Sequence, residues 1–216
     1  MTNPMSLLGK KILAVGGGSS LDLAIVNTLQ ELGAEVFVIE DASAISIDVA
    51  FDGFFWGGVH SDFRPLKMVS HDNMAQIMND NYFAFIDLLR DLIKQKRIAK
   101  NASIVAMSSI SSIRAMKAKM VFSAAKAALD ASVRSLALEL APKGIRINTI
   151  QKGAVDVDFE KGHIQVVNSL NEDMSGRQVL GLTAASEVAN LVAFLLSDAT
   201  QTMTGTSIVI DGGYTL

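Results

Sequence analysis

Short apolar runs alternate along the chain with longer stretches in which apolar residues recur at helical spacing. Apolar runs of four to six residues between polar or glycine-rich segments are typical of buried strands in a parallel sheet. The expected strands are Ile12–Val15, Val36–Ile39, Phe54–Trp56, Ile104–Met107, Ile145–Ile150 and Ser207–Ile210. The expected helices are Leu21–Leu32, Met74–Lys96, Phe122–Leu140 and Ser186–Ser197.

This alternation predicts one α/β domain over residues 1–216, with no repeat or linker inside it. Right-handed crossovers between parallel strands give a Rossmann-like, doubly wound sheet flanked by helices in three layers. Gly33 and Gly144 follow helical patterns and are expected to end those helices. Ser186 is expected to cap the start of the last helix.

The segment after the second strand is unusually short. Ile45–Asp48 has the pattern of a third strand, and Asp52–Trp56 follows almost at once. A linker of three or four residues reaches about 10–14 Å, whereas two intervening strands separate a third from a fourth strand by about 14 Å. A parallel third strand would also need to return to the opposite end of the sheet. We therefore expect this strand to be lost, shortened or reversed, and its crossover helix to be absent.

Composition narrows the class of protein. Half of the 216 residues are hydrophobic, 19% are charged and the net charge is −3. No basic stripe is present to neutralise phosphates, so we expect no nucleic-acid partner. The densest basic run, Lys94–Arg97 with Lys100, follows a helical pattern and is interpreted as a solvated helix end.

The residue inventory also argues against several kinds of site. The chain has no cysteine, and its three histidines are scattered without ligand spacing, so we expect neither disulfides nor a metal site. No apolar run approaches the ~18 residues of a membrane span, and no signal peptide is recognised. A cytoplasmic location is expected.

A glycine-rich turn, Gly16–Gly18, joins the first strand to the first helix. Such a turn presents backbone N–H groups to a pyrophosphate, so Gly16, Gly18, Ser20 and Leu21 are candidate cofactor-binding residues. Asp22 would oppose that pyrophosphate by roughly 1–3 kcal/mol if its carboxylate faced it. The alternative interpretation is a tight turn that no longer binds a nucleotide.

Acidic residues end the second strand at Glu40 and Asp41. An acid at this place suits the ribose 2′-hydroxyl of NAD and repels the 2′-phosphate of NADP. NAD is therefore favoured over NADP if either binds, and Asp48 is a further candidate cofactor contact. A solvated strand end is the alternative interpretation.

Two long segments resemble a known family. The stretch SIVAMSSISS, with VFSAAKAALDASVRSLALELAPKGIRIN after it, resembles the catalytic half of a short-chain dehydrogenase/reductase. The ending GLTAASEVANLVAFLLSDATQTMTGTSIVIDGGYTL resembles the family's last helix, last strand and Asp-Gly-Gly turn. The resemblance covers nearly the whole chain. It implies the fold of an enzyme that moves hydride between a nicotinamide cofactor and a small alcohol or carbonyl compound.

The resemblance also implies a catalytic set. Ser109 matches the serine that holds the carbonyl, Lys126 the lysine that contacts the nicotinamide ribose, and Asn81 the helical asparagine of the proton relay. Phe122 stands where the family has its tyrosine, and a phenyl ring has no ionisable proton. Losing a positioned general acid costs about 10²–10⁴-fold in rate. Structural roles for Lys126, Ser109 and Asn81 stay open.

Other family positions differ as well. In the family's TGxxxGxG turn only Gly16 clearly survives, because Ser20 and Asp22 replace the second and third glycines. WGGV stands where NNAG is usual, while Lys152 replaces the proline of the PG segment and Val157 a threonine that contacts the cofactor. The polar segment Asp158–Arg177 occupies the place of the substrate lid, or is a surface loop.

Other side chains could replace the phenol. His60 follows the fourth-strand segment and could titrate near neutral pH, although an exposed loop histidine is the simpler interpretation. Weaker candidates lie in the loop before the catalytic helix: Ser111, Ser112, Lys117 and Lys119.

Two functions therefore remain open. One is an oxidoreductase with a substitute proton donor or water; the other is a catalytically inactive relative that binds ligands, regulates or acts as a scaffold. The long helices Met74–Lys96 and Phe122–Leu140 pair across a two-fold axis in the resembled family, so a homodimer or homotetramer is expected.

Overall fold

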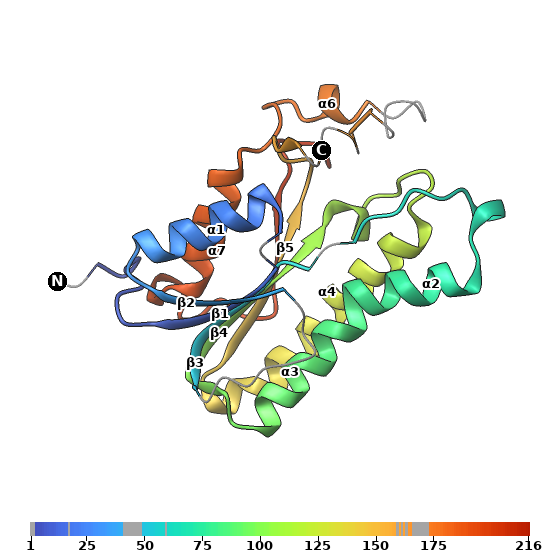
Figure 1. The fold of residues 1–216 in the computed structure, drawn as a ribbon. Coiled ribbons are helices and arrows are strands. Elements are labelled where there is room, and N and C mark those ends of the chain that lie inside the picture. The colour runs from blue at the N-terminus through green and yellow to red at the C-terminus, as the bar shows by residue number, and fades with distance from the viewer. Residues whose placement is uncertain are drawn as a thin grey trace.

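The computed structural model describes residues 3–16, 18–40, 49–58, 60–158, 160, 162, 164–165 and 173–216. These residues build a three-layer α/β fold around a six-stranded parallel sheet of order β2-β1-β3-β4-β5-β6 (Figure 1). The strands are β1 (Lys11–Val15), β2 (Glu35–Ile39), β3 (Phe51–Trp56), β4 (Ile98–Ser109), β5 (Arg146–Lys152) and β6 (Ser207–Ile210). The predicted fold class is confirmed.

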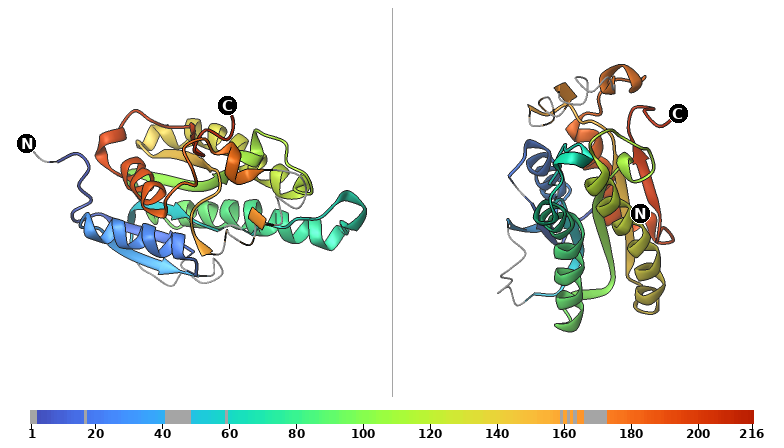
Figure 2. Two further views of the ribbon diagram at one scale, coloured as in Figure 1. Left: turned by 90° about the horizontal axis from the view of Figure 1, so that it is seen from above. Right: turned by 90° about the vertical axis from the view of Figure 1, so that its right-hand side faces the viewer.

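Two helical layers enclose the sheet, as the views in Figure 2 show. The helices α1 (Ser20–Glu31) and α7 (Ala185–Leu196) pack together on one face, and α3 (Ala84–Lys94) and α4 (Met120–Leu140) cover the other. Each face has its own apolar core. In β3, Phe55 belongs to the α1/α7 core, whereas its neighbours Phe54 and Trp56 belong to the α3/α4 core, because successive strand residues point to opposite faces.

The helix predicted over Met74–Lys96 is interrupted. It consists of α2 (His71–Met78), one π-helical turn (Asn79–Phe83) and α3. The wider π turn inserts an extra residue into the helical path, which commonly happens at functional sites. The last helix of the lid region is the short α6 (Met174–Arg177).

The predicted helix ends are confirmed at two glycines and wrong at one cap. Gly33 and Gly144 have φ of +95° and +71°, a backbone conformation that glycine adopts without strain. Ser186, however, lies inside α7, and the residue before that helix is Ala184. The Glu187 carboxylate accepts a hydrogen bond from the Ala184 N–H at 2.7 Å, so a side chain from the first turn satisfies the helix start.

Within the described residues, β2 forms one edge of the sheet and no helix lies between β2 and β3. The absence of a crossover helix stays a prediction, because most of the residues between β2 and β3 are outside the described ones. The expected third strand, Ile45–Asp48, lies outside the described residues, as do Asp41 and the candidate cofactor contact Asp48. β1 is flanked by β2 and β3, and its carboxyl end opens into the glycine-rich turn.

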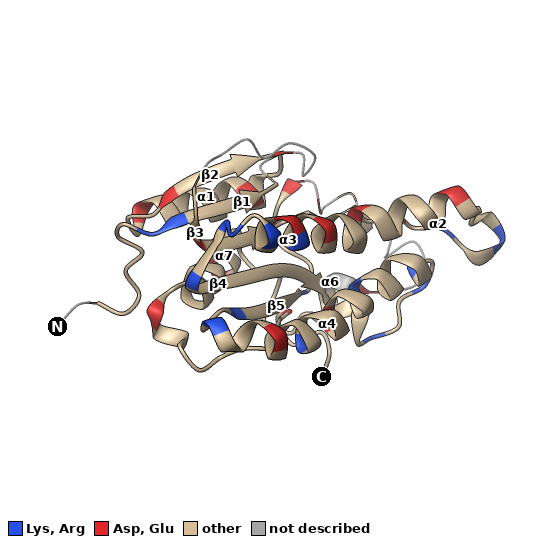
Figure 3. Ribbon diagram, turned by 90° about the horizontal axis from the view of Figure 1, so that it is seen from below, with Lys and Arg blue, Asp and Glu red and all other residues tan. Residues whose placement is uncertain are grey.

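Charged residues of both signs are interspersed on the surface, for example along α3, where Asp87 and Asp91 flank Arg90 (Figure 3). This mixture agrees with the expectation that the protein does not bind nucleic acid, which stays a prediction. None of the helices in the described part of the chain is long and apolar enough to cross a membrane.

Candidate active site

The carboxyl ends of β1, β3, β4 and β5 meet at one edge of the sheet, where ligands bind in open α/β folds. Two cavities open there. The larger, of about 430 Å³, lies over the glycine-rich turn, and the smaller, of about 50 Å³, lies beyond the end of β4. Lys152 and Glu160 line both cavities, so this pair forms the wall between them.

The glycine-rich turn forms the rim of the large cavity. All four of its predicted cofactor-binding residues line that cavity: Gly16, Gly18, Ser20 and Leu21. Gly16 has φ of +125° and donates its N–H to the Ile39 carbonyl, which ties the turn to the end of β2. A Cβ on Gly18 would meet no atom within 4 Å, so this position faces open space.

The Asp22 carboxylate is turned towards the turn rather than towards solvent. Its Oδ2 accepts hydrogen bonds from the Ser19 N–H at 3.3 Å and the Ser19 hydroxyl at 2.8 Å, while the Asp22 N–H donates to Ser19 Oγ. This capping box stabilises the start of α1. It also occupies the Ser19 N–H and places a negative charge in the wall of the cavity. The carboxylate thus lies in the wall of the cavity over the turn, where its repulsion of a pyrophosphate was considered from the sequence.

Two glycines after β3 keep the large cavity open. A Cβ on Gly57 would lie 2.7 Å from Asp22 Oδ1, and a Cβ on Gly58 would lie 2.8 Å from the Trp56 ring. Larger residues would force these neighbours to move. The bulky side chains of β3 do not fill the cavity, since Phe55 and Trp56 are buried in the two cores.

Phe122 lies in the first turns of α4 and lines the small cavity. Its side chain is buried, and two ammonium groups lie close to its ring. Lys119 Nζ is 5.2 Å and Lys126 Nζ is 5.6 Å from the ring centroid. The two cations are attracted to the ring, and the ring supplies no proton to either of them.

Lys126 is fully buried and lines neither cavity. Its Nζ donates to the Met107 carbonyl at 3.0 Å and to the Gly58 carbonyl at 3.4 Å, so it joins the ends of β4 and β3. Burial and, to a lesser degree, the nearby Lys152 cation lower the pKa of Lys126 to about 7, against the opposing effect of Asp130. In this arrangement the lysine has the structural role that the sequence left open.

Serine side chains from the end of β4 line the small cavity. Ser109 Oγ accepts hydrogen bonds from the Ser111 N–H at 3.2 Å and the Ser111 hydroxyl at 3.1 Å, so its own proton is available to a ligand. Ser108 and Ser61 also line this cavity, and neither hydroxyl has a hydrogen-bond partner in the described structure. Ser109 was predicted; Ser61 and Ser108 were missed.

These features can be compared with known proteins. The sequence matches the family described as Enoyl-(Acyl carrier protein) reductase over residues 56–215, about three-quarters of the chain. The chain belongs to the short-chain dehydrogenase/reductase family. Among proteins of curated function, none matches the sequence.

Solved structures agree with this family assignment. A short-chain dehydrogenase family protein from Francisella tularensis is 26% identical, with a TM-score of 0.84, and the match covers 95% of this chain and 98% of that one. A putative 2-deoxy-D-gluconate 3-dehydrogenase from Agrobacterium tumefaciens with bound NADP is 22% identical, with a TM-score of 0.88 and 99% coverage of both chains. A putative NAD(P)-dependent gluconate 5-dehydrogenase from Beutenbergia cavernae, with NADP at low occupancy, is 20% identical, with a TM-score of 0.87 and 99% coverage of both.

The asparagine of this short-chain dehydrogenase/reductase, Asn81, lies in the π turn and is fully buried. Its Nδ2 donates to the carbonyls of Ile77 and His60, at 2.9 and 2.8 Å, and its Oδ1 accepts from the His60 N–H at 3.2 Å. Both amide protons are used. The side chain therefore fastens the segment after β3 to the helix and has no proton left for a water relay in this arrangement.

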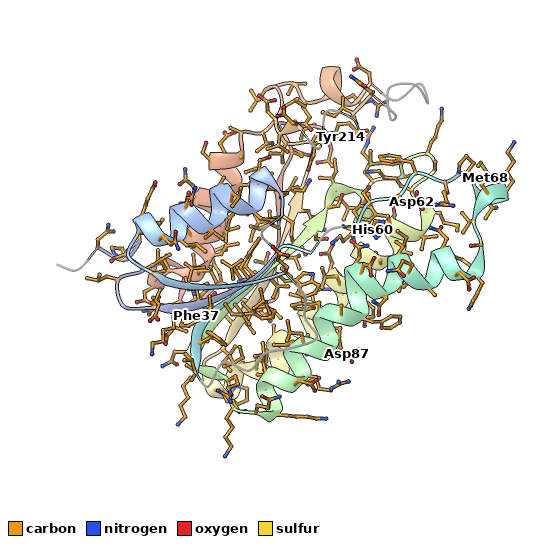
Figure 4. All side chains as sticks on the ribbon, in the orientation of Figure 1. Phe37, His60, Asp62, Met68, Asp87 and Tyr214 are labelled. Carbon is orange, nitrogen blue, oxygen red and sulfur yellow. The ribbon has the colours of Figure 1, made fainter. Side chains whose placement is uncertain are left out.

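His60 is not a substitute proton donor in this structure. Its side chain is 53% exposed, and Nδ1 pairs with Asp80 Oδ2 at 2.6 Å on the outer side of the helix. Burial alone would raise the pKa of Asp80, but hydrogen bonds from Gln76 and His60 outweigh that effect and lower it. Figure 4 shows His60 and Asp62 in the segment that leads from β3 to α2. The simpler interpretation, an exposed loop histidine, is the better description.

Lys152 stands at the family's proline position and forms an ion pair with Glu160. Its Nζ pairs with Glu160 Oε1, and the other carboxylate oxygen, Oε2, accepts the Val155 N–H at 2.8 Å. Glu160 comes from the predicted lid, so this ion pair fastens the described part of the lid to the end of β5. Val157 lines the large cavity with an apolar side chain, where the family's threonine would offer a hydroxyl.

No group of three or more histidine, aspartate or glutamate residues that could hold a metal occurs among the residues that the structure describes. Glu40 directly follows β2 and is exposed, next to the strand end that holds Gly16. The predicted cofactor residues thus lie on the large cavity, except for Glu40 beside it, the enclosed Lys126 and Asp48, which is outside the described residues.

Proposed function

We propose that this protein is an oxidoreductase that transfers hydride between a nicotinamide cofactor and a small alcohol or carbonyl compound. The observation that carries the proposal is the open cavity of about 430 Å³ over the glycine-rich turn, next to a smaller cavity lined by Ser109. Membership of the short-chain dehydrogenase/reductase family supports it, as does the NADP held by two structures of the same fold.

The residues of the large cavity fit a dinucleotide in shape better than in charge. Gly16 and Gly18 allow close approach to the backbone, and the space above them is open. Asp22 opposes the pyrophosphate at the same place, by roughly 1–3 kcal/mol at intermediate dielectric. We therefore expect weak binding rather than none.

The cofactor, when bound, would supply or accept the hydride. Ser109 would donate its hydroxyl proton to the carbonyl oxygen in a hydrogen bond, since both bonds that its Oγ now makes are accepted from Ser111. Phe122 would provide an apolar wall and no proton. Water in the small cavity would then protonate the oxygen, so turnover would be slow.

NAD is proposed over NADP because of Glu40. Glu40 follows β2, whose last residue Ile39 is hydrogen-bonded to Gly16 of the large cavity, and an acid at this strand end suits a ribose hydroxyl and repels a phosphate. The NADP in the two related structures concerns those proteins, so the preference here has to be measured.

The direct test is thermal unfolding with NAD, NADH, NADP and NADPH. A nucleotide at 100 times its Kd stabilises the folded protein by about 2.7 kcal/mol. We expect shifts with NAD and NADH, followed by slow oxidation of NADH with a panel of small carbonyl compounds. If none of the four changes the melting temperature, the proposal fails, and Phe122 and Asp22 would favour a non-catalytic ligand-binding relative instead.

We also propose a homodimer or homotetramer, assembled through the face that carries α3 and α4. Exposed apolar side chains on this side, such as Phe83 and Leu138, support the proposal. Light scattering after size exclusion measures the mass directly, and a monomer at micromolar concentration would contradict it. A cytoplasmic location stays a prediction.

A further inference from the structure

The polar atoms of the small cavity are unevenly matched. Its walls hold hydrogen-bond donors from three separate parts of the chain, namely Lys119, Ser61 and the pair Ser108 and Ser109. The acid in this wall, Glu160, is already paired with Lys152 and with the Val155 N–H. The lysine ammonium and the serine hydroxyls can therefore donate to a ligand, and the carboxylate of this wall is already paired.

Lys119 is the central feature of this cavity. Its side chain is buried, with a relative exposure of 8% for the residue, and its described contacts are the rings of Phe63, at 4.3 Å, and Phe122, at 5.2 Å. No carboxylate pairs with it in the described part of the chain. Burial removes the water that would solvate the Lys119 ammonium, and aromatic faces compensate for that loss only weakly. The site therefore lacks the anion that would stabilise this cation.

The charge of Lys119 persists near neutral pH. Burial and, to a lesser degree, Lys152 lower its pKa to about 8, against the opposing effect of Glu160. The ammonium form therefore predominates at pH 7. A ligand that carries a negative charge would meet a buried cation that is attracted by Glu160 but forms no ion pair with any described residue.

The hydroxyl groups point to the same kind of ligand. Ser108 is 1% exposed, and its Oγ, like that of Ser61, has no partner among the described residues. Buried hydroxyls are nearly always hydrogen-bonded in folded proteins, so two such groups in one cavity call for polar atoms from outside the chain, and each hydroxyl can donate to an acceptor held beside Lys119. A carboxylate has two oxygens that accept several hydrogen bonds and carry the matching charge.

We infer that the small cavity binds a carboxylate, and that the substrate is a short oxo acid or the corresponding hydroxy acid. Lys119 holds the carboxylate, with Ser108 and Ser61 as further donors, while Ser109 holds the carbonyl or hydroxyl oxygen. One water needs about 10–15 Å³, so a cavity of about 50 Å³ admits a ligand of only a few heavy atoms. This inference rests on the proposed function for its reaction, but the binding itself needs no cofactor.

The experiment measures binding of small acids to the protein without nucleotide, by ligand-observed NMR titration and thermal unfolding. The probes are pyruvate and acetoacetate, with methyl pyruvate and acetone as uncharged counterparts. We expect the acids to bind at least tenfold more tightly than the uncharged compounds. Lys119→Met should weaken acid binding at least tenfold, and Ser108→Ala by a few-fold.

Two variants control for charge and folding. Lys117→Met removes an exposed lysine two residues away and should leave acid binding unchanged. Lys119→Arg keeps the cation and should retain most of the binding. The thermal unfolding of each variant is recorded without ligand, so that a loss of binding is scored only on folded protein.

Equal affinity for acids and uncharged compounds, or unchanged acid binding in Lys119→Met, would overturn the inference. Unchanged acid binding in Lys119→Met is also the result expected if Lys119 served as the proton donor of the reaction, because acid binding would then not depend on this residue. Nucleotide shifts measured on the same samples separate the two proposals. Shifts with NAD but no acid binding would leave the oxidoreductase standing and remove its substrate class.

Discussion

The two cavities at the carboxyl edge of the sheet differ in what forms their walls. The large cavity is bordered mostly by the glycine-rich turn and by the glycines after β3. The small cavity is bordered by side chains with specific chemistry, among them Ser108, Ser109, Lys119 and Phe122. One cavity therefore derives its shape from the backbone, and the other derives its properties from individual residues.

This difference explains how the two cavities respond to substitution. Ser20 and Asp22 stand at glycine positions of the family motif, and the large cavity is nevertheless open over the turn between β1 and α1. At the small cavity Phe122, at the position of the family's tyrosine, contributes a ring without an ionisable proton. Substitutions thus leave an open space at the large cavity and change the chemistry of the small one.

The largest expected effect comes from restoring the phenol. In Phe122→Tyr the new hydroxyl extends the ring beside Lys119 and Lys126, two cations that favour the phenolate. We expect NADH-dependent turnover of carbonyl compounds to rise by about 10²–10⁴-fold. Absorbance at the reduced nicotinamide band measures it.

Phe122→Leu is the matched control, since it changes the ring without adding a hydroxyl, and it should not raise turnover. If Phe122→Tyr binds NAD and turns over no faster than the unmodified protein, the defect lies beyond the phenol. The enclosed position of Lys126, away from both cavities, would then be the first explanation to examine.

The second prediction uses the buried cation behind the small cavity. Lys126 has a pKa of about 7 in the fold and an ordinary lysine value of 10.5 when unfolded. Between these values the unfolded chain binds more protons, so the free energy of unfolding rises with pH, by roughly 1 kcal/mol per unit. Below pH 7 both states are protonated and the pH dependence from this group vanishes.

Urea unfolding at pH 7, 8 and 9 measures this rise, to which Lys119 adds above pH 8. Lys126→Met should flatten the curve, whatever its effect on stability at a single pH. Lys117→Met, the exposed control, should keep the original slope. Parallel curves for Lys126→Met and the unmodified protein would show that burial does not shift this lysine.

Most of the fold could be predicted because each buried strand corresponds to an apolar run in the sequence. The start of β4 was predicted wrongly. β4 begins at Ile98, six residues before the predicted start, because Lys100 and Asn101 interrupt the pattern with exposed polar side chains. The π turn at Asn79–Phe83 was also missed, since one extra residue alters only a single interval in an otherwise helical apolar pattern.

Site residues were easiest to predict where neighbours in sequence are neighbours in space, whereas Ser109 and Phe122 were found through the resemblance to the family. The glycine-rich turn is one continuous segment, so Gly16, Gly18 and Ser20 were found together. The small cavity is lined by Ser61, Ser108 and Lys119, which come from three segments of the chain. Their separation in the sequence does not indicate that they are close in space. The direction of the Asp22 carboxylate likewise depends on its hydrogen bonds with Ser19, and the sequence alone does not show these bonds.

The third prediction tests whether charge limits the large cavity. Asp22→Asn keeps an acceptor for the Ser19 N–H and removes the negative charge from the cavity wall. We expect the Kd for NAD to fall about tenfold, within the 1–3 kcal/mol that the repulsion would cost. Titration calorimetry measures this Kd.

Asp72→Asn, in the first turn of α2, makes the same change on an exposed site and should leave the Kd unchanged. Equal Kd values for Asp22→Asn and the unmodified protein would mean that Asp22 does not face the pyrophosphate.

The smallest expected effect concerns the choice between the two dinucleotides. Glu40→Gln removes the charge beside the rim of the large cavity, so the ratio of the Kd values for NADP and NAD should fall by a few-fold as the repulsion of the 2′-phosphate is lost. Glu35→Gln makes the same substitution at the opposite end of β2 and should not change this ratio. If both variants change it equally, the preference comes from the net charge of the protein and not from a contact at the strand end. If only Glu40→Gln changes the ratio, a side chain just outside the large cavity selects the cofactor. Individual side chains would then determine the chemistry of both cavities, although fewer of them act at the large cavity than at the small one.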